Sequence, residues 1–244
     1  MLKTGNCDPY DVLSNYSTYL KDNGNGNNKI SLVTLKLRVV TAKNFLEYHD
    51  VDISLRKFKL KVKLPKVIRR SKESLSKEDI IDVLNACSDI RLKTYVILLA
   101  GTGCRAVEAL SIRIKDLNLD SHPARVFIRG EYTKTKVDRY VFLTNEIVSQ
   151  LKTWLDYKYH RRKICYKDNK TGKTITEYRT PEKNYNDLIF SVYQNLLGPY
   201  PKNIYLGLVD SFAKTLDRIG KGNREDGNGR RRQITLHSFR RYVK

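Results

Sequence analysis

The chain has 244 residues, of which 47 are Lys or Arg and 26 are Asp or Glu, giving a formal net charge of +21. This charge exceeds what solubility requires and imposes a strongly positive field, so we expect a polyanionic partner. Because 40% of the residues are hydrophobic and basic residues recur along the whole length, the composition excludes a disordered basic tail and predicts a folded protein.

No segment of the sequence points to a membrane. The longest clearly apolar run, residues 95–100, is too short to cross a bilayer, and the N-terminus has no apolar signal core. No basic amphipathic helix dominates, so nucleic acid is favoured over a membrane surface as the partner. We therefore expect a cytoplasmic protein that is associated with the nucleoid.

Four cysteines and four histidines are dispersed along the chain without a C-x-x-C pair. This spacing supports neither a zinc site nor a disulfide framework. We expect no metal and no cofactor.

The first 72 residues predict two helices and a basic connection. Residues 11–21 and 31–49 hold apolar side chains at helical steps, with a polar turn between them. Residues 55–72 hold nine basic residues and no acidic one, and Pro65 blocks a continuous helix. We interpret this stretch as an interdomain linker that lies along a phosphate backbone; a solvated basic strand is the alternative.

A second domain is predicted from Ser76, where Ser-Lys-Glu-Asp has the form of a capping box. Two short β-type runs flank a basic loop and predict a hairpin, while residues 161–187 are polar and predict a second hairpin or an insertion. Thr144 is a candidate helix cap and Gly220 a candidate helix stop. The helical patterns lie at residues 80–87, 94–100, 105–117, 147–155 and 203–219, with another starting at 236, and the β-type runs lie at residues 125–129 and 139–143.

Three segments of this second domain carry cations that could meet at one phosphate: TGCRAVEAL, EYTKTKVDR and LHSFRR. Arg105 and Glu108 lie three residues apart, as do His237 and Arg240, so on a helix each pair shares a face. Lys134 is predicted at the tip of a hairpin, where a long side chain reaches outward.

The order and spacing of these segments resemble the tyrosine recombinase family, which includes phage integrases and the Xer proteins, and the resemblance covers most of the chain. GTGCRAVEALSIRIKDLNL is similar to the family's first arginine box, with Arg105, Glu108 and Asp116 at the matching positions. TKTKVDRYVFL resembles the family's turn between two strands, with a catalytic lysine five residues before an arginine, here Lys134 and Arg139. LHSFRR is similar to the family's H-x-x-R box.

The resemblance implies a role for each residue. Arg105 and Arg240 would clamp the non-bridging oxygens of a phosphodiester, and Lys134 would protonate the departing 5′ oxygen. His237 would position or relay a proton, and Glu108 would orient Arg105 and its helix. No metal is needed, because the arginines supply the electrostatic stabilisation.

Plainer interpretations stand beside these roles. Arg105 taken alone is an exposed helix cation, and His237 taken alone is a satisfied histidine. Glu108 is equally well a simple helix ion pair, and Lys136 shares the loop of Lys134.

Further DNA contacts are expected from basic side chains in the linker, the hairpin and the last segment. These are Lys63, Lys66, Arg69, Arg70, Lys72, Lys136, Arg139 and Arg241.

The family's nucleophilic tyrosine lies beyond the H-x-x-R box, on a later helix. Tyr242 follows Arg240 by two positions and faces a different side of the helix, so it is a poor candidate for in-line attack. We expect a chain that is truncated before its nucleophile, with none among its residues, and that binds DNA without cleaving it.

The expected fold is mainly α with a small antiparallel β-sheet (α+β). The resemblance implies a helical core-binding (SAM-like) domain at residues 1–64, a basic linker at 65–75 and a catalytic domain at 76–244 that is incomplete at its C-terminus. The two domains would clamp double-stranded DNA as a C.

The complete enzyme would act as a homotetramer in DNA integration or recombination. It would cut through a 3′-phosphotyrosyl bond and resolve a Holliday junction. The alternatives are a non-catalytic DNA-binding protein and a type IB topoisomerase-like enzyme.

Overall fold

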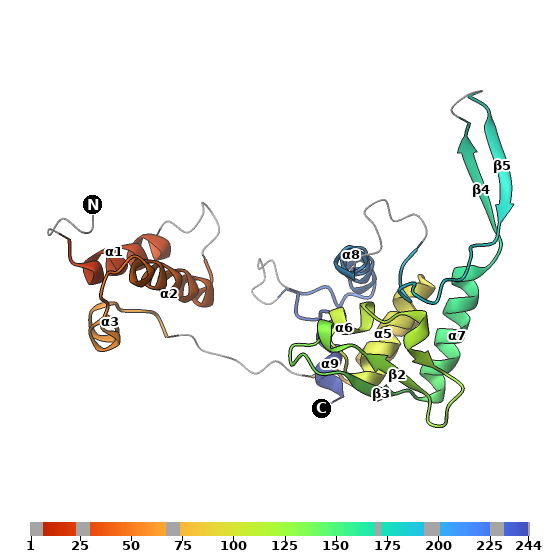
Figure 1. Ribbon diagram of the computed structural model, residues 1–244, viewed down its shortest axis with the longest axis horizontal. Helices are drawn as coiled ribbons and strands as arrows, with labels where there is room; N and C mark the ends of the chain where they lie inside the picture. The colour runs from red at the N-terminus through yellow and green to blue at the C-terminus, as the bar shows by residue number, and fades with distance from the viewer. Residues whose placement is uncertain are drawn as a thin grey trace. The chain divides into compact units, whose positions relative to one another are not determined.

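The computed structural model describes residues 7–22, 30–66, 74–168, 172–192, 201–224 and 232–243. The chain divides into two compact units, Met1–Lys72 and Glu73–Lys244. Helices dominate both units in the described parts, and two small antiparallel sheets lie in the second, which confirms the predicted α+β class (Figure 1). Among the described helices, none combines the length and apolar character needed to cross a bilayer.

The first unit is built on helices that pack around a small apolar core. Ser31 caps the second of them, because its hydroxyl accepts a hydrogen bond from the backbone N–H of Thr34 at 3.2 Å. Leu35 and Val39 on that helix are buried. The helices are α1 (Pro9–Asp22), α2 (Leu32–Tyr48) and α3 (Leu55–Lys61).

The basic stretch of residues 55–72 is not a linker throughout, which corrects the prediction. Residues 55–61 form α3, and Phe58 and Val62 are buried in the core of the first unit. The prediction was wrong because it weighted charge over the apolar pair at four-residue spacing, which gives a helix one buried face. Residues 67–72 of this stretch lie outside the described residues.

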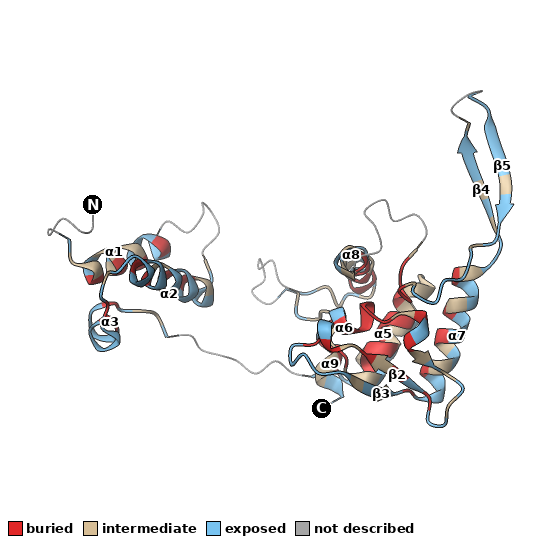
Figure 2. Ribbon diagram, viewed as in Figure 1, coloured by how far each residue is buried: buried red, intermediate tan, exposed pale blue. Residues whose placement is uncertain are grey.

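The second unit has α5 at its centre, where α4, α6, α7, α8 and α9 pack against it (Figures 1 and 2). Its core includes Tyr95 on α5 and Trp154 on α7, both almost fully buried. The helices are α4 (Lys77–Ala86), α5 (Ile90–Thr102), α6 (Ala106–Leu110), α7 (Asn145–Tyr159), α8 (Pro201–Arg218) and α9 (Phe239–Tyr242). Short 3-10 turns lie at Ile114–Asp116 and Gly130–Tyr132.

The predicted capping box at Ser76 and the predicted helix stop at Gly220 are confirmed. The Ser76 hydroxyl accepts from the backbone N–H of Asp79, whose carboxylate accepts from the backbone N–H of Ser76, both at 3.0 Å. Gly220 follows α8 in the left-handed conformation, with φ of 71°. Thr144 holds the N-cap position of α7, although its side chain makes no capping hydrogen bond there.

Two antiparallel sheets belong to this unit. The three-stranded sheet has the order β1 (Leu117–Asn118), β2 (Arg125–Ile128) and β3 (Arg139–Phe142), and β2 pairs with β3 in the register Val126↔Val141 and Ile128↔Arg139. The predicted second hairpin is formed by β4 (Arg162–Lys167) and β5 (Thr174–Arg179).

The predicted helix at residues 105–117 is wrong beyond residue 110. After α6 the chain turns and pairs with residues 187–189, because Ile114 N–H donates to the Asp187 carbonyl at 3.0 Å and Ile189 N–H donates to the Ile112 carbonyl at 2.9 Å. Pairing with a distant segment supplies the hydrogen bonds that a longer helix would have made.

Lys158 fixes this paired segment from the other side. Its buried ammonium donates to the carbonyls of Leu188 and Ile189 at 2.7 and 3.3 Å, and to the hydroxyl of Ser191 at 3.2 Å. Burial lowers the pKa of Lys158 to about 8, against the opposing charge of Asp187.

Lys158 therefore makes the stability of the second unit depend on pH. Between about pH 8 and 10.5 the unfolded state holds more protons at this lysine than the folded state, so its contribution to stability rises with pH. We expect the unfolding free energy of the wild type to rise relative to Lys158→Met across this window, by at most about 1.4 kcal/mol per pH unit. Chemical denaturation at pH 7.5, 9 and 10 measures the difference.

The matched control is Lys152→Met, which removes an exposed lysine of the same helix. Its stability should follow the wild type at every pH. Parallel curves for the wild type and Lys158→Met would contradict the assigned proton equilibrium.

Candidate active site

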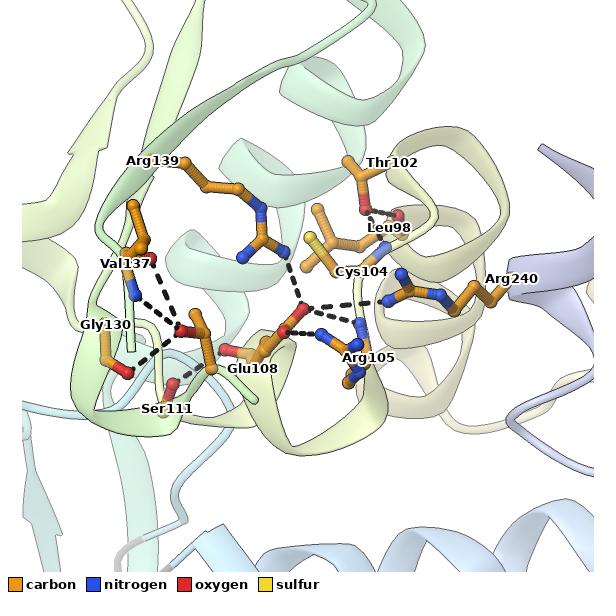
Figure 3. A network of polar contacts seen from close by, with 11 residues as sticks. Leu98, Thr102, Cys104, Arg105, Glu108, Ser111, Gly130, Val137, Arg139 and Arg240 are labelled. Carbon is orange, nitrogen blue, oxygen red and sulfur yellow. Dashed lines mark hydrogen bonds and ion pairs between the residues drawn. The ribbon is translucent and has the colours of Figure 1, made fainter. Parts of the chain in front are cut away.

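Glu108 is the centre of a cluster of arginines drawn from three elements of the second unit (Figure 3). Its carboxylate is fully buried. It accepts from the Arg105 guanidinium at 2.7 Å, from the Arg105 backbone N–H at 2.9 Å and from the Arg139 guanidinium at 2.6 Å. Arg240 Nη1 lies 4.0 Å from the same carboxylate. One acid therefore gathers three guanidiniums.

The backbone explains why these side chains meet. Gly103 ends α5 in the left-handed conformation, with φ of 61°, and this turn places Arg105 at the N-cap of α6. Arg139 opens β3 opposite Ile128, whose side chain is buried, so the register turns Arg139 toward the core side of the sheet. Arg240 comes from α9.

Hydrogen bonds keep Glu108 ionised despite its burial. Burial acts to raise the pKa of this carboxyl, but the N–H of Arg105 and the guanidiniums of Arg139 and Arg105 outweigh it and hold the pKa below its usual range. At Arg139, burial opposes the charge, while the bond to Glu108 leaves the pKa raised. The cluster of three cations and one anion thus carries a net charge of +2 at neutral pH.

Arg240 has bonding capacity left over. Its Nη1 atom is buried and has no hydrogen-bond partner among the described residues. A buried charged donor without a partner is costly unless a ligand satisfies it. The cluster therefore has a net positive charge and one guanidinium nitrogen whose hydrogen bond is unsatisfied.

The loop between β2 and β3 places Lys134 in solvent. Thr133 holds the loop, because its hydroxyl donates to the Gly130 carbonyl at 3.0 Å and accepts from the Val137 N–H at 3.2 Å. Lys136 has a positive φ of 56°, and its ammonium donates to the Glu131 carbonyl at 3.0 Å. Lys134 is exposed, and within the described residues its ammonium has no acceptor.

His237 does not share a helix with Arg240, which corrects the geometry expected for this pair. The helix begins at Phe239, and His237 lies exposed in the turn before it. Ser238 shapes this turn, because its N–H donates to the Thr235 carbonyl at 2.8 Å. The apolar and basic pattern of this segment did not reveal where the turn gives way to helix.

The other expected contact residues are spread over both units. Lys63 and Lys66 are exposed in the first unit, whereas Arg69, Arg70 and Lys72 lie outside the described residues. In the second unit Arg241 is half-buried and donates to the Ser238 hydroxyl at 3.0 Å, and Tyr242 is 40% exposed.

Sequence reasoning missed two ion pairs of the second unit, one of them in this cluster. Arg139 was expected only as a DNA contact, yet it binds Glu108 directly. Asp116 accepts two hydrogen bonds from Arg129, at 2.7 and 3.2 Å, and one from the Arg113 N–H at 2.9 Å. The alternation of β3 was the one signal for Arg139, because it puts this residue on the side of Val141.

The described parts of the chain contain no group of three His, Cys, Asp or Glu side chains that could hold a metal ion. The positive charge of the cluster comes from guanidiniums.

Comparison with known proteins identifies a family and relatives of this chain. Residues 73–190 match the model of the phage integrase family. Tyrosine recombinase XerA of Saccharolobus solfataricus is 32% identical over 126 residues, which cover 52% of this chain and 40% of that protein. XerA of Pyrococcus horikoshii is 25% identical over 152 residues, covering 59% of this chain and 50% of that protein. The matched region thus spans half or less of each relative.

A solved structure has a similar fold. The Tn1549 transposon integrase in complex with transposon right end DNA superposes with a TM-score of 0.57 and 14% identity, covering 96% of this chain and 72% of that one. At this identity the likeness concerns the fold.

Replacing the central acid tests the cluster. We expect Glu108→Gln to lower the unfolding free energy by about 2 kcal/mol, because three guanidiniums lose their shared anion, with partial exposure of the arginines moderating the loss. Sulfate should restore much of the stability, since a bound anion replaces the missing charge. Denaturation curves in sodium sulfate and in sodium chloride of equal ionic strength measure both effects.

Glu78→Gln, an exposed acid on α4, is the matched control and should gain nothing specific from sulfate. Equal responses of the two variants to sulfate would show that the cluster has no affinity for anions.

Proposed function

Since this chain belongs to the tyrosine recombinase family through its residues 73–190, we propose that it acts in site-specific DNA recombination or integration by cutting and rejoining strands through a 3′-phosphotyrosyl bond. The supporting observation is the arginine cluster, with its charge of +2 and the unsatisfied buried donor of Arg240. A DNA phosphodiester is a singly charged anion whose oxygens match guanidinium donors.

Arg105 and Arg240 hold the scissile phosphate in this proposal. A phosphodiester under attack gains charge on its non-bridging oxygens, and guanidiniums fixed in advance stabilise that charge without reorganising. Glu108 touches no substrate. It is a positioning residue, because it fixes Arg105 and Arg139 and lies 4.0 Å from Arg240.

Lys134 is the proposed general acid. An exposed ammonium on a loop can approach the 5′ oxygen and donate a proton as the bond to phosphorus breaks. Lys136 is the weaker candidate, because its ammonium already donates to the Glu131 carbonyl. His237, in the turn before Arg240, is proposed to relay a proton at the attacking hydroxyl.

The proposed assembly is a homotetramer on double-stranded DNA in the nucleoid. The core-binding domain at residues 1–64, the linker at 65–75 and the catalytic domain at 76–244 would each contact the duplex. Lys63, Lys66, Lys136, Arg139 and Arg241 would neutralise phosphates. The reaction conserves bond energy in the phosphotyrosyl ester, so it needs no ATP.

A second function, DNA binding without cleavage, is favoured by the place of Tyr242. Side chains two positions apart on a helix point to different faces, and Tyr242 follows Arg240 by two. We therefore expect duplex DNA binding without a covalent adduct at Tyr242.

An exogenous nucleophile separates the two functions. A duplex that the chain selects from a random library is incubated with hydrogen peroxide and a metal chelator. In the recombinase proposal the peroxide oxygen attacks the clamped phosphorus, the 5′ oxygen leaves with a proton from Lys134, and a nick appears at one position. We expect Arg105→Gln, Arg240→Gln and Lys134→Gln to reduce nicking at least 100-fold, as measured on denaturing gels with saturating protein.

Other results would assign a different function. Binding without peroxide-dependent nicking would identify a non-catalytic DNA-binding protein. A covalent adduct on a nicked duplex that disappears in Tyr242→Phe would make this tyrosine the nucleophile. Relaxation of supercoiled plasmid without site preference would favour a type IB topoisomerase-like enzyme.

A further inference from the structure

The β4–β5 hairpin projects from the second unit at the end of α7 (Figure 1). Its strands pair from Arg162↔Arg179 to Lys167↔Thr174, and most of its residues are exposed (Figure 2). An isolated two-stranded ribbon is marginally stable in water. The hairpin therefore gains most from a partner that covers it.

The root of the hairpin is fixed. Arg162 donates to the carbonyls of Lys158 and Tyr157 at 2.7 and 3.1 Å, so its guanidinium caps the C-terminal end of α7. Its planar group also lies over the Tyr157 ring, 5.8 Å from the centroid. Lys158 in turn binds the chain that returns from β5. The β4–β5 hairpin, here also called the arm, is thus held rigidly at its root.

The two faces of the ribbon differ in charge. Cross-strand partners share a face, and one face, here called the lysine face, has ammonium and hydroxyl groups and no carboxylate. On the other face the one acid, Glu177, pairs with Arg179. The lysine face consists of Lys163, Cys165, Lys167, Thr174, Thr176 and Tyr178.

The charge of the arm is strongly positive. Residues 161–179 contain seven Lys or Arg and two Asp or Glu, a net charge of +5. Lys163 and Lys167 are exposed and have no ion-pair partner among the described residues. Arg161 lies over the Tyr178 ring at 5.2 Å, which adds a cation at the edge of the lysine face.

We propose that the lysine face binds the sugar–phosphate backbone of duplex DNA outside the phosphate held by the arginine cluster. The inference rests on the proposed function, which supplies the duplex. At about 3.3 Å per residue the six-residue strands span roughly 20 Å, and Lys163 and Lys167 lie about 13 Å apart. A duplex presents one phosphate per strand every 3.4 Å along its axis, so both lysines reach phosphates at once.

The salt dependence of DNA binding tests whether the lysine face contacts phosphates. Fluorescence anisotropy with the full chain and a labelled duplex is measured from 0.05 to 0.3 M KCl. Each phosphate contact contributes about 0.9 to the slope of log affinity against log salt. We expect Lys163→Gln/Lys167→Gln to lower the slope by roughly 1.8 and to weaken binding at 0.1 M salt at least tenfold.

Arg179→Gln is the matched control. It removes one positive charge from the same hairpin on the opposite face, and it leaves Glu177 without its partner. Its slope should equal that of the wild type, because Arg179 contacts no phosphate in the proposal. The single variants Lys163→Gln and Lys167→Gln should each lose about 0.9.

The outcomes distinguish a failure of the DNA-binding proposal for the lysine face from a failure of the proposed function. Wild-type binding with unchanged slopes in the lysine variants would overturn the proposal for the lysine face and leave the proposed function intact. Equal losses of slope in Arg179→Gln and in the lysine single variants would also overturn the proposal for the lysine face. Such a result would show that the slope depends on the overall positive charge and not on contacts of this face. Loss of self-association in sedimentation, with unchanged DNA binding, would make the hairpin a protein contact instead. Failure of the wild type to bind any duplex would overturn both proposals.

Discussion

The rest of the second unit depends on the ion pairs that the buried carboxylate of Glu108 makes with arginines. The carboxylate joins α6, β3 and α9 through Arg105, Arg139 and Arg240, which lie as many as 135 residues apart in sequence. A single negative charge cannot neutralise three guanidiniums. The folded chain therefore keeps two positive charges close together, a repulsion that a bound anion relieves. The site is therefore less stable than it would be with its charges fully neutralised.

The scaffold around the acid limits how far the arginines can move. Gly103 turns the chain between α5 and α6, and a side chain there would meet Val243 at 3.3 Å. On the other side, residues 112–114 pair with 187–189, and Lys158 holds that segment by its carbonyls. The position of Arg105 thus depends on hydrogen bonds made far along the chain. A cationic site needs this rigidity, because loose guanidiniums would separate.

Local signals in the sequence were sufficient where the interaction is local. The Ser76 capping box, the Gly220 stop and the amphipathic helices depend on residues within one or two turns of one another, and their predictions are confirmed. Predictions failed where a distant segment decides the backbone. The helix ends after residue 110 because the following backbone forms hydrogen bonds with residues 187–189. The basic residues 55–61 form α3 because Phe58 packs into the core of the first unit.

In the candidate site too, local features could be predicted from the sequence and contacts between distant segments could not. Spacing within each motif singled out Arg105, Glu108 and Arg240, whereas the bond between Glu108 and Arg139 depends on the register of β3 against β2. A one-residue slip would turn Arg139 to the solvent face, where Tyr140 and Phe142 now lie. Such a register is set by the strand pairing and by the loop that Thr133 holds. The alternation along β3 puts Arg139 on the side of Val141, but it does not fix which residue of β2 lies opposite.

The two basic regions of the second unit use different cations for physical reasons. The buried cluster uses arginine, which keeps its charge when desolvated and offers several donors in one plane. The exposed ribbon carries Lys163 and Lys167, whose flexible, hydrated ammonium groups adapt to phosphates without fixed geometry. In the ribbon the fixed guanidinium is Arg162, and it serves the root. Arginine therefore fixes geometry in both places, whereas the lysines of the ribbon remain exposed.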